Sequence, residues 1–227
     1  MAASDRIVVV IAAYNEAPVI TSVVADIRRA SYPAVVVDDG STDATGEIAA
    51  RAGAFVVTHP VNLGQGAALQ TGLDFALAQG ADVIVTFDAD GQHRPADIAP
   101  LIAALAANKA DYALGSRFLG GAVNLPRKRR LMLAAATWFT RLTTGLDLTD
   151  THNGLRAMTR RGASRIRLKQ NRMAHASEIL HQIAQGGLAY VEVPVTIEYS
   201  AYSLGKGQTL SESLAILIDL FARRMHR

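Results

Sequence analysis

Two aspartates separated by one residue, Asp88 and Asp90, directly follow the apolar run Val83–Phe87. Such a run is typical of a buried strand, so both carboxylates are expected at the end of a sheet. Mg²⁺ and Mn²⁺ prefer oxygen ligands and often take only one or two protein carboxylates, keeping positions for phosphate oxygens. Gln92 and His93 follow and could add a contact. Although such pairs also occur in turns and helix caps, their position here predicts a divalent cation that binds a diphosphate.

A second acidic pair, Asp38 and Asp39, ends another apolar run. Carboxylates at a strand end can accept hydrogen bonds from a nucleobase or a ribose hydroxyl. The segment Tyr14–Glu16 offers an aromatic ring and an acceptor that could frame a base. The alternative is that Ser41 or Thr42 caps a helix and that Tyr14–Glu16 only ends a strand. Gly64 lies in NLGQG, which opens a helix whose free N–H groups could meet an anion.

Apolar runs of strand length alternate with amphipathic segments through the first half of the chain. The predicted strands are Ile7–Ala13, Ala34–Val37, Ala54–Thr58, Val83–Phe87 and Tyr112–Gly115. The predicted helices are Pro18–Ala30, Thr42–Ala52, Gly66–Gln79 and Pro95–Ala107. This alternation predicts an α/β fold, a mostly parallel sheet with helices on both faces. Ligands bind such sheets beyond the carboxyl ends of the strands, where the polar motifs lie.

After Ser116 the regular alternation ends. A Gly-rich loop and a basic run, Leu119–Leu125 and Pro126–Arg130, precede the predicted apolar helix Leu131–Leu142, which contains Trp138. The remaining predicted elements are a helix at Ala174–Gln185, two short strands at Ala189–Val193 and Val195–Tyr199 around Pro194, and a final amphipathic helix at Leu210–Arg224.

Charge is distributed unevenly along the 227 residues. Residues 1–116 carry 6 basic and 13 acidic side chains, a net charge of −7, whereas residues 117–227 carry 17 basic and 7 acidic ones, a net charge of +10. An acidic half can hold a cation, and a basic half attracts phosphates, anionic lipids or nucleic acid, unless its arginines only form a solvated face. No linker or repeat divides the chain, so we expect a single domain, 1–227, with two functionally distinct halves.

The chain has no cysteine, which excludes a disulfide scaffold and Cys-ligated metal sites and fits a reducing compartment. Its first residues lack the features of a signal peptide, and no apolar run reaches the roughly 18–20 residues that cross a bilayer. We therefore expect a cytoplasmic protein that is soluble or rests on a membrane surface.

Taken together, the motifs resemble glycosyltransferase family 2, whose members have the GT-A fold. The matching segments are VVVIAAYNE, VVDDGSTD, NLGQGAALQTG, DADGQH and GSRFLGG, in family order and at family-like spacing. The chain is most similar to the polyprenyl-phosphate glycosyltransferases of the dolichyl-phosphate mannose synthase type. It departs from them at Ala12, Gln65 and Ala134, where proline, lysine and serine are usual. Its segment Tyr199–Gln208 resembles short bacterial members, some of which work with a small membrane-protein partner.

The resemblance implies roles for individual residues. Contact with the nucleotide is implied for Ala12, Tyr14, Glu16, Asp38, Asp39, Gly64, Asp88 and Ala89. The metal and the donor diphosphate would be held by Asp88, Asp90 and Gln92. The acceptor phosphate would meet Arg117 and Arg130, with Arg129 close behind. The catalytic set is thus Asp88, Asp90, Arg117 and Arg130, while Glu178 and Glu192 match family acidic positions of less defined role.

The function expected on this basis is inverting, Mg²⁺- or Mn²⁺-dependent transfer of a sugar from a nucleotide sugar to a polyprenyl phosphate at the inner face of the cell membrane. The resemblance favours UDP-GlcNAc or UDP-Glc over GDP-mannose. A phosphate acceptor is already largely ionised at neutral pH, so this reaction needs no strong base. Leu131–Leu142 and Leu210–Arg224 would be interfacial helices, or the former a core helix and the latter a contact with a partner or a second copy.

Two rival functions remain open from the sequence. A soluble glycosyltransferase that acts on a saccharide hydroxyl would need a carboxylate base, for which Asp150 and Glu178 are the candidates. A non-enzymatic nucleotide or nucleic-acid binding protein would use the basic half. The basic cluster Arg156–Arg172 could bind lipid head groups or form a solvated charged surface. Aromatic residues that stack on bases are scarce, at 6% of the chain, so we expect no nucleic-acid partner.

Overall fold

A single seven-stranded sheet organises the chain in the computed structural model, which describes residues 6–170 and 174–206. The strand order is β3-β2-β1-β4-β6-β5-β7, and β6 alone runs antiparallel to its neighbours. The strands are β1 (Ile7–Ala13), β2 (Ala34–Asp38), β3 (Phe55–Thr58), β4 (Val83–Asp88), β5 (Tyr112–Val123), β6 (Arg156–Thr159) and β7 (Tyr190–Glu198). The predicted α/β architecture is therefore confirmed.

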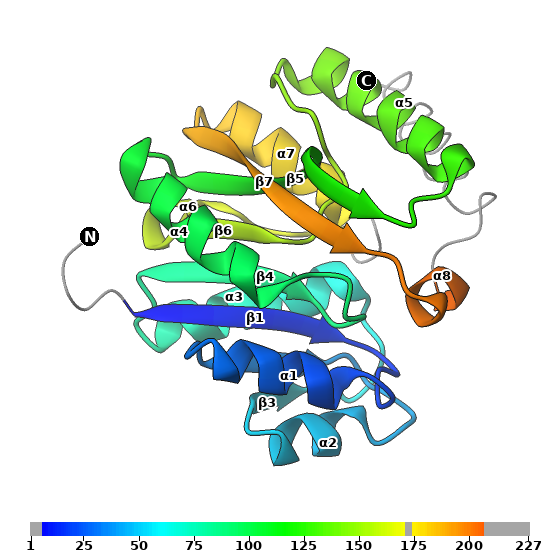
Figure 1. Ribbon diagram of the computed structural model, residues 1–227. Helices are drawn as coiled ribbons and strands as arrows, with labels where there is room; N and C mark the ends of the chain where they lie inside the picture. The colour runs from blue at the N-terminus through cyan, green and yellow to red at the C-terminus, as the bar shows by residue number, and fades with distance from the viewer. Residues whose placement is uncertain (1–5, 171–173, 207–227) are drawn as a thin grey trace.

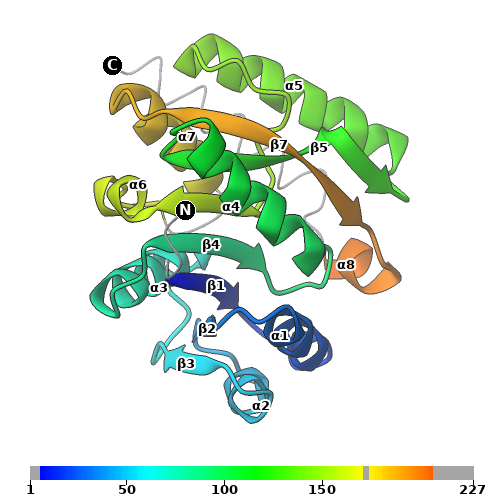
Figure 2. The same ribbon diagram turned by 60° about the vertical axis from the view of Figure 1, so that its left-hand side comes forward.

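Helices cover both faces of this sheet, as expected. They are α1 (Ile20–Arg29), α2 (Thr45–Arg51), α3 (Gln65–Ala78), α4 (Ile98–Ala107, after the 3-10 turn η1, Pro95–Asp97), α5 (Arg127–Thr144), α6 (Arg160–Arg165), α7 (His175–Gln185) and α8 (Ala201–Lys206). The helices α1, α2 and α4 pack on one face and α3, α6 and α7 on the other, each over its own apolar cluster (Figures 1 and 2). The parallel strands point toward one edge, where α8 lies (Figure 1).

The second half of the sheet differs from the prediction in two strands. The segment expected to be a Gly-rich loop continues β5 as far as Val123, and β7 runs without interruption through Pro194. A proline is tolerated there because β7 is the edge strand of the sheet and has β5 as its neighbouring strand on one side only. The close approach of the two strands requires Gly120, since a Cβ at that position would lie 2.3 Å from the carbonyl oxygen of Val195.

Two further differences concern the basic half. The sequence analysis did not predict β6, whose four residues fall inside the cluster expected to form a charged surface. The helix α5 begins at Arg127, so the basic run forms its first turn directly after Pro126. A proline whose φ is fixed near −65° is favourable at a helix start. The predicted helix Leu210–Arg224 lies outside the described residues.

Candidate functional site

The carboxyl ends of β1, β2 and β4 gather the motifs predicted to bind a nucleotide and a metal. Strand register places Ala12 beside Asp88 and Ala13 beside Asp38. Because the three strands are parallel, the acidic residues that follow them share one edge of the sheet. The structure thus brings together the two acidic pairs that the sequence separates by about fifty positions.

Asp88 is the last residue of β4, and its carboxylate contacts His93. Nε2 of His93 forms a hydrogen bond with Oδ2 of Asp88 at 2.8 Å. The side chain of Asp88 is 34% exposed. Burial alone would raise the pKa of Asp88, but His93, Arg156 and His175 outweigh it, and the pKa is lowered. Asp88 is therefore a carboxylate over the whole neutral range. His93 Nδ1 is buried without a hydrogen-bond partner among the described residues.

Asp90 lies two residues further on and is bound by Gln92. The Gln92 backbone N–H donates to Oδ1 of Asp90 at 3.1 Å, and the Gln92 side-chain amide lies 2.5 Å from Oδ2. Burial, followed by the charge of Asp88, raises the pKa of Asp90 to about 6. Because the negative charge of Asp88 raises the proton affinity of Asp90, a cation bound between the two carboxylates would stabilise this site.

The donor set fits Mg²⁺ or Mn²⁺ better than a metal with a complete protein cage. Asp88, Asp90 and Gln92 all present oxygen-bearing side chains at one strand end. Within residues 6–170 and 174–206, no group of three or more His, Asp or Glu side chains could hold a metal ion. A hard cation held here would take the two carboxylates and complete its shell with substrate phosphates and water.

The two acidic residues at the end of β2, Asp38 and Asp39, make different contacts. Asp39 is 2% exposed and accepts hydrogen bonds from the Leu63 and Gly64 backbone N–H groups at 3.0 and 2.7 Å, with His59 Nδ1 at 2.7 Å. It therefore fixes the loop that leads into α3. Asp38, 6% exposed, accepts from the backbone N–H of Ser41 at 3.1 Å. Strand pairing places Asp38 opposite Ala13 of β1, and the preceding residue, Ala12, lies opposite Asp88. Asp38 is therefore the member of the pair that lies near the predicted metal motif.

The YNE motif after β1 meets the far end of the described chain. Tyr202, in α8, donates its hydroxyl to Oε2 of Glu16 at 2.8 Å. Glu16 is buried, and its backbone N–H donates to the hydroxyl of Thr45 at 2.8 Å. Tyr14 is 41% exposed, as suits a ring that receives a ligand. The segment after β7 therefore closes against the residues predicted to frame the nucleotide.

Arg117, predicted to meet the acceptor phosphate, is the centre of a buried network. Its side chain is 5% exposed, and Nε donates to Oδ2 of Asp150 at 2.6 Å. Its two terminal nitrogens donate to the hydroxyl of Tyr199 at 2.6 Å and to the carbonyl oxygen of His152 at 2.5 Å. Each of the three guanidinium nitrogens of Arg117 thus has a protein partner, and the buried side chain is held in a fixed position.

Arg129 joins the same network from α5. Its guanidinium lies over the ring of Tyr199, 5.1 Å from the ring centroid, while the hydroxyl of that tyrosine binds Arg117. Arg130 is on the exposed side of the helix. The structure therefore brings two of the three predicted acceptor arginines, Arg117 and Arg129, to the hydroxyl and the ring of one tyrosine. The sequence analysis did not identify Tyr199, because a single Tyr just after a strand carries no distinguishing pattern.

The two acidic residues of undefined role hold backbone segments. Glu192, in β7, accepts from the Thr149 and Asp150 backbone N–H groups and from the Thr149 hydroxyl at 2.8 to 3.1 Å. Glu178, in α7, accepts from the backbone N–H groups of Lys169 and Gln170 at 2.9 to 3.1 Å. Glu192 thereby fixes the loop that carries the partner of Arg117.

Arg156 is the main site residue that the sequence analysis missed. It lies in β6 opposite Thr86 and is 4% exposed, and its charge interacts with both Asp88 and Asp150. The nearby His152 has a pKa lowered to about 4, chiefly by burial, so it is neutral at pH 7. The sequence does contain a sign of this role, since Arg156 stands alone among the apolar residues Leu155, Ala157 and Met158. An arginine in an apolar run is expected to be buried beside a charged partner.

Comparisons with known proteins identify the family of this chain. Residues 8–167 match the family described as Glycosyl transferase family 2. The chain is 31% identical to a UDP-N-acetylglucosamine–dolichyl-phosphate N-acetylglucosaminyltransferase of Methanococcus voltae, with 98% of each chain covered. It is 30% identical to a polyprenol monophosphomannose synthase of Mycolicibacterium smegmatis, covering 93% of this chain and 85% of the relative.

A solved structure shares the fold. Glucosyl-3-phosphoglycerate synthase from Mycobacterium tuberculosis, crystallised with Mn²⁺, UDP-glucose and phosphoglyceric acid, superimposes with a TM-score of 0.75 at 23% identity, covering 97% of this chain and 80% of that one. The fold is accordingly GT-A. The family match spans more than half of the chain and agrees with the relatives and with the acidic motifs at the strand ends. The chain is a glycosyltransferase and belongs to glycosyltransferase family 2.

Proposed function

We propose that this enzyme transfers a sugar from a nucleotide sugar to a polyprenyl phosphate, with inversion at the anomeric carbon, and so makes a lipid-linked sugar for cell-envelope glycans. Relatives whose names give dolichyl phosphate or undecaprenyl phosphate as acceptor support the lipid substrate. A UDP-sugar, UDP-GlcNAc or UDP-Glc, is the preferred donor, and GDP-mannose is the alternative. The proposed donor half is residues 1–116 and the acceptor half residues 117–227 of one domain.

The observation that carries the proposal is the state of the two candidate bases. A saccharide hydroxyl must lose a proton as it attacks, so it needs a carboxylate free to accept one. Asp150 is 1% exposed in its side chain and is bound by Arg117, and Glu178 is occupied by two backbone N–H groups. A phosphate monoester needs no such base, because it is largely ionised at neutral pH. The arrangement around Arg117 therefore favours a phosphate acceptor.

The proposed reaction is a single displacement. Arg129 and Arg130, with Arg117 behind them, would bind the acceptor phosphate and hold one of its oxygens in line with the anomeric carbon. Asp38, Glu16 and Tyr14 would hold the nucleotide, with Ala12, Gly64 and Ala89 lining its path. No covalent intermediate on the enzyme is needed, because the attacking oxygen is already anionic.

Asp88 and Asp90, with Gln92 beside them, would hold Mg²⁺ or Mn²⁺. Such a cation would neutralise the charge that develops on the departing diphosphate. His93 and Arg156 keep Asp88 ionised, so this carboxylate is ready to bind a cation at neutral pH. Activity should therefore be lost in EDTA and restored by Mn²⁺, and full activity in EDTA would contradict the proposal.

We place the enzyme at the inner face of the cell membrane as a peripheral protein. Helix α5 supports this, because Leu131, Trp138 and Leu142 are 75, 65 and 65% exposed on it, and basic residues precede them. No helix in the described part of the chain has the length and apolarity to cross a bilayer. A small membrane-protein partner or a second copy of the chain is the alternative means of attachment.

The deciding experiment incubates the full chain with radiolabelled UDP-GlcNAc, UDP-Glc or GDP-mannose, Mn²⁺ and a short-chain polyprenyl phosphate, followed by extraction into organic solvent. Alkali-resistant but acid-labile label in the organic phase from one donor is the expected result. Label that stays in water, on an added soluble saccharide or phosphorylated acid, would replace the lipid acceptor by a soluble one. Omission of the acceptor controls for donor hydrolysis.

A further inference from the structure

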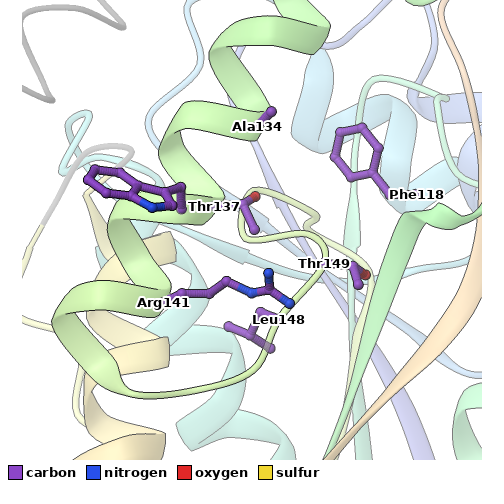
Figure 3. A pocket seen from close by; sticks show the side chains of 7 residues that line it. Phe118, Ala134, Thr137, Arg141, Leu148 and Thr149 are labelled. Atoms are coloured by element: carbon purple, nitrogen blue, oxygen red, sulfur yellow. The ribbon is translucent and has the colours of Figure 1, made fainter.

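A pocket of about 310 Å³ opens between α5 and the segments facing it. Its lining residues are Phe118, Ala134, Thr137, Trp138, Arg141, Leu148 and Thr149. Phe118 from β5 faces Ala134 at one end, and Arg141 and Leu148 lie at the other (Figure 3). The volume is at the lower end of the range for small-molecule sites, about 300–1,000 Å³. Most of the wall is hydrocarbon, so the pocket suits an apolar guest.

This pocket adjoins the proposed phosphate site through the chain itself. Phe118 directly follows Arg117, and Thr149 directly precedes Asp150, the partner of Arg117. Arg129 lies on the same helix as Ala134, five residues earlier, a rise of about 7.5 Å along the axis. Arg130 precedes Ala134 by four residues and so lies one turn away on the same side of α5, which places one end of the pocket next to an arginine proposed to bind the phosphate.

The polar groups of the pocket are already engaged by the protein. The Thr149 hydroxyl lies 2.6 Å from that of Ser116 and also donates to Glu192. The hydroxyl of Thr137 lies 3.5 Å from that of Thr151, and Arg141 forms an ion pair with Asp147. A sugar would have to compete with these partners, whereas a hydrocarbon chain would not. The wall therefore discriminates against a saccharide guest.

The outer rim of the pocket leads onto an exposed apolar strip. Leu131, Trp138 and Leu142 are spaced seven and four residues apart, so they lie on one side of α5. Exposed apolar groups that gather in this way mark a contact with another molecule or with a membrane. A chain that left the pocket past Trp138 would therefore continue over an apolar surface.

We propose that this pocket binds the first isoprene units of the polyprenyl phosphate, which lie along α5 between the arginines at its amino-terminal end and the apolar strip at Trp138. The inference rests on the proposed function and adds to it the place and the chemistry of the lipid tail. The anionic phosphate would lie beside the basic surface at Arg129, and the branched apolar tail that follows it would lie against the apolar wall at Phe118 and Leu148. The pocket would then select acceptors by their first isoprene units.

The chain contains its own probe for this proposal, because Trp138 is its single tryptophan. The full chain is titrated with geranyl phosphate, which is short enough to stay monomeric, and the tryptophan emission is recorded. We expect a saturable blue shift that inorganic phosphate does not produce. An emission unchanged by geranyl phosphate but shifted by vesicles of anionic phospholipid would overturn the pocket and leave only a helix that rests on a bilayer.

Two substitutions of Ala134 test the pocket directly, since this residue lines it and is otherwise exposed. Ala134→Leu and Ala134→Phe fill the pocket by increasing amounts, and Ala135→Phe is the matched control, because Ala135 is an exposed alanine of the same helix outside the lining. We expect the acceptor KM to rise with the added volume, by roughly tenfold or more for Ala134→Phe, because several methylene groups lose their burial. The donor KM, the circular dichroism spectrum and the control variant should stay as in the unmodified enzyme.

The outcomes separate this inference from the proposed function. If the lipid phosphate is glycosylated with the same KM by Ala134→Phe, the pocket assignment is wrong and the proposed function stands. If geranyl phosphate shifts the emission but no polyprenyl phosphate is glycosylated with any donor, the proposed function fails and the pocket remains a prenyl-phosphate site. A folded Ala134→Phe variant that keeps the full fluorescence response would also overturn the assignment.

Discussion

Gly154 lies so close to Asp88 that a Cβ on the glycine would be 2.2 Å from Oδ1 and 2.3 Å from Oδ2 of the carboxylate. A real Cβ cannot occupy that position, so the bare backbone of the segment before β6 shapes the space around the metal motif. The hydroxyl of Thr86 fixes that backbone by donating to the carbonyl oxygen of Gly154 at 2.6 Å. A residue of the proposed acceptor half thus lies directly against the carboxylate of the proposed donor site.

Gly154→Ala should displace the Asp88 carboxylate. We expect the affinity for Mn²⁺ to fall by about tenfold or more, and overpacking to cost about 1–3 kcal/mol of unfolding free energy. Isothermal titration with Mn²⁺ and thermal unfolding measure the two effects. Gly121→Ala is the control, because its Cβ would meet the side chain of Thr196 at an ordinary 3.6 Å. Equal Mn²⁺ affinity in both variants would show that the glycine does not shape the metal site.

The raised pKa of Asp90 predicts how stability depends on pH without metal. The folded protein keeps this proton up to about pH 6, whereas the unfolded chain releases it near pH 3.9. Folded molecules therefore bind more protons between these values, and the contribution of Asp90 to stability falls as the pH rises through about 4 to 6. The side chain introduced in the variant Asp90→Asn does not titrate. In EDTA, the Tm of the variant minus the Tm of the unmodified protein should therefore increase by roughly a few degrees as the pH is raised from about 4 to 6. A constant difference in Tm would refute the shift.

The arrangement of Arg129 over Tyr199 predicts its share in acceptor binding. A charge-assisted phosphate contact contributes about 1.5–3 kcal/mol, so Arg129→Ala should raise the acceptor KM by about ten- to a hundredfold, with the donor KM unchanged. Arg130→Ala should have a smaller effect, because Arg130 is on the exposed side of α5. Lys128→Ala, on the same turn, serves as the control. Steady-state kinetics with varied donor and varied acceptor separate the outcomes, and an increase in donor KM alone would reverse the roles of the two halves.

The buried ion pair of Arg117 and Asp150 predicts non-additive effects on stability. Arg117→Met leaves Asp150 buried without its main partner and should cost about 3–5 kcal/mol of unfolding free energy. The double variant Arg117→Met, Asp150→Leu removes both charges and should recover most of that loss. Urea unfolding of the two single variants and the double variant gives the coupling energy. If the losses simply add, the pair is not the unit that holds β5 to the following loop.

The sequence was sufficient for the parallel half of the fold, and the reason is local. Buried strands such as β1 and β4 are apolar runs, and β1 spans the predicted residues, Ile7–Ala13. The strand β6 could not be predicted in the same way, because its four residues begin with Arg156, whose burial depends on charges distant in the chain. Pro194 divided the predicted β7 for a similar reason, since only the sheet order shows that it lies at an edge.

The candidate site likewise has parts that could be predicted from local sequence and parts that could not. The acidic motifs could be assigned from sequence because each directly follows its strand. The surroundings of Arg117 could not, since Asp150, Tyr199 and His152 approach it only in the folded chain. The same holds for Tyr202, which binds Glu16 across 186 positions. Long-range polar contacts leave no periodic pattern, so they were found only in the structure.

The position of β6 between β4 and β5 has a consequence for synthesis on the ribosome. Until residues 156–159 have emerged, β4 lacks its neighbour on one side, and β5 cannot join the sheet through β6. Non-local strand pairing is slow, and unpaired strand edges promote aggregation while they persist. The nascent chain therefore joins β5 to the sheet formed by β1 to β4 only after residue 159 has emerged, and a chaperone that shields the β4 edge until then should raise the yield of folded enzyme.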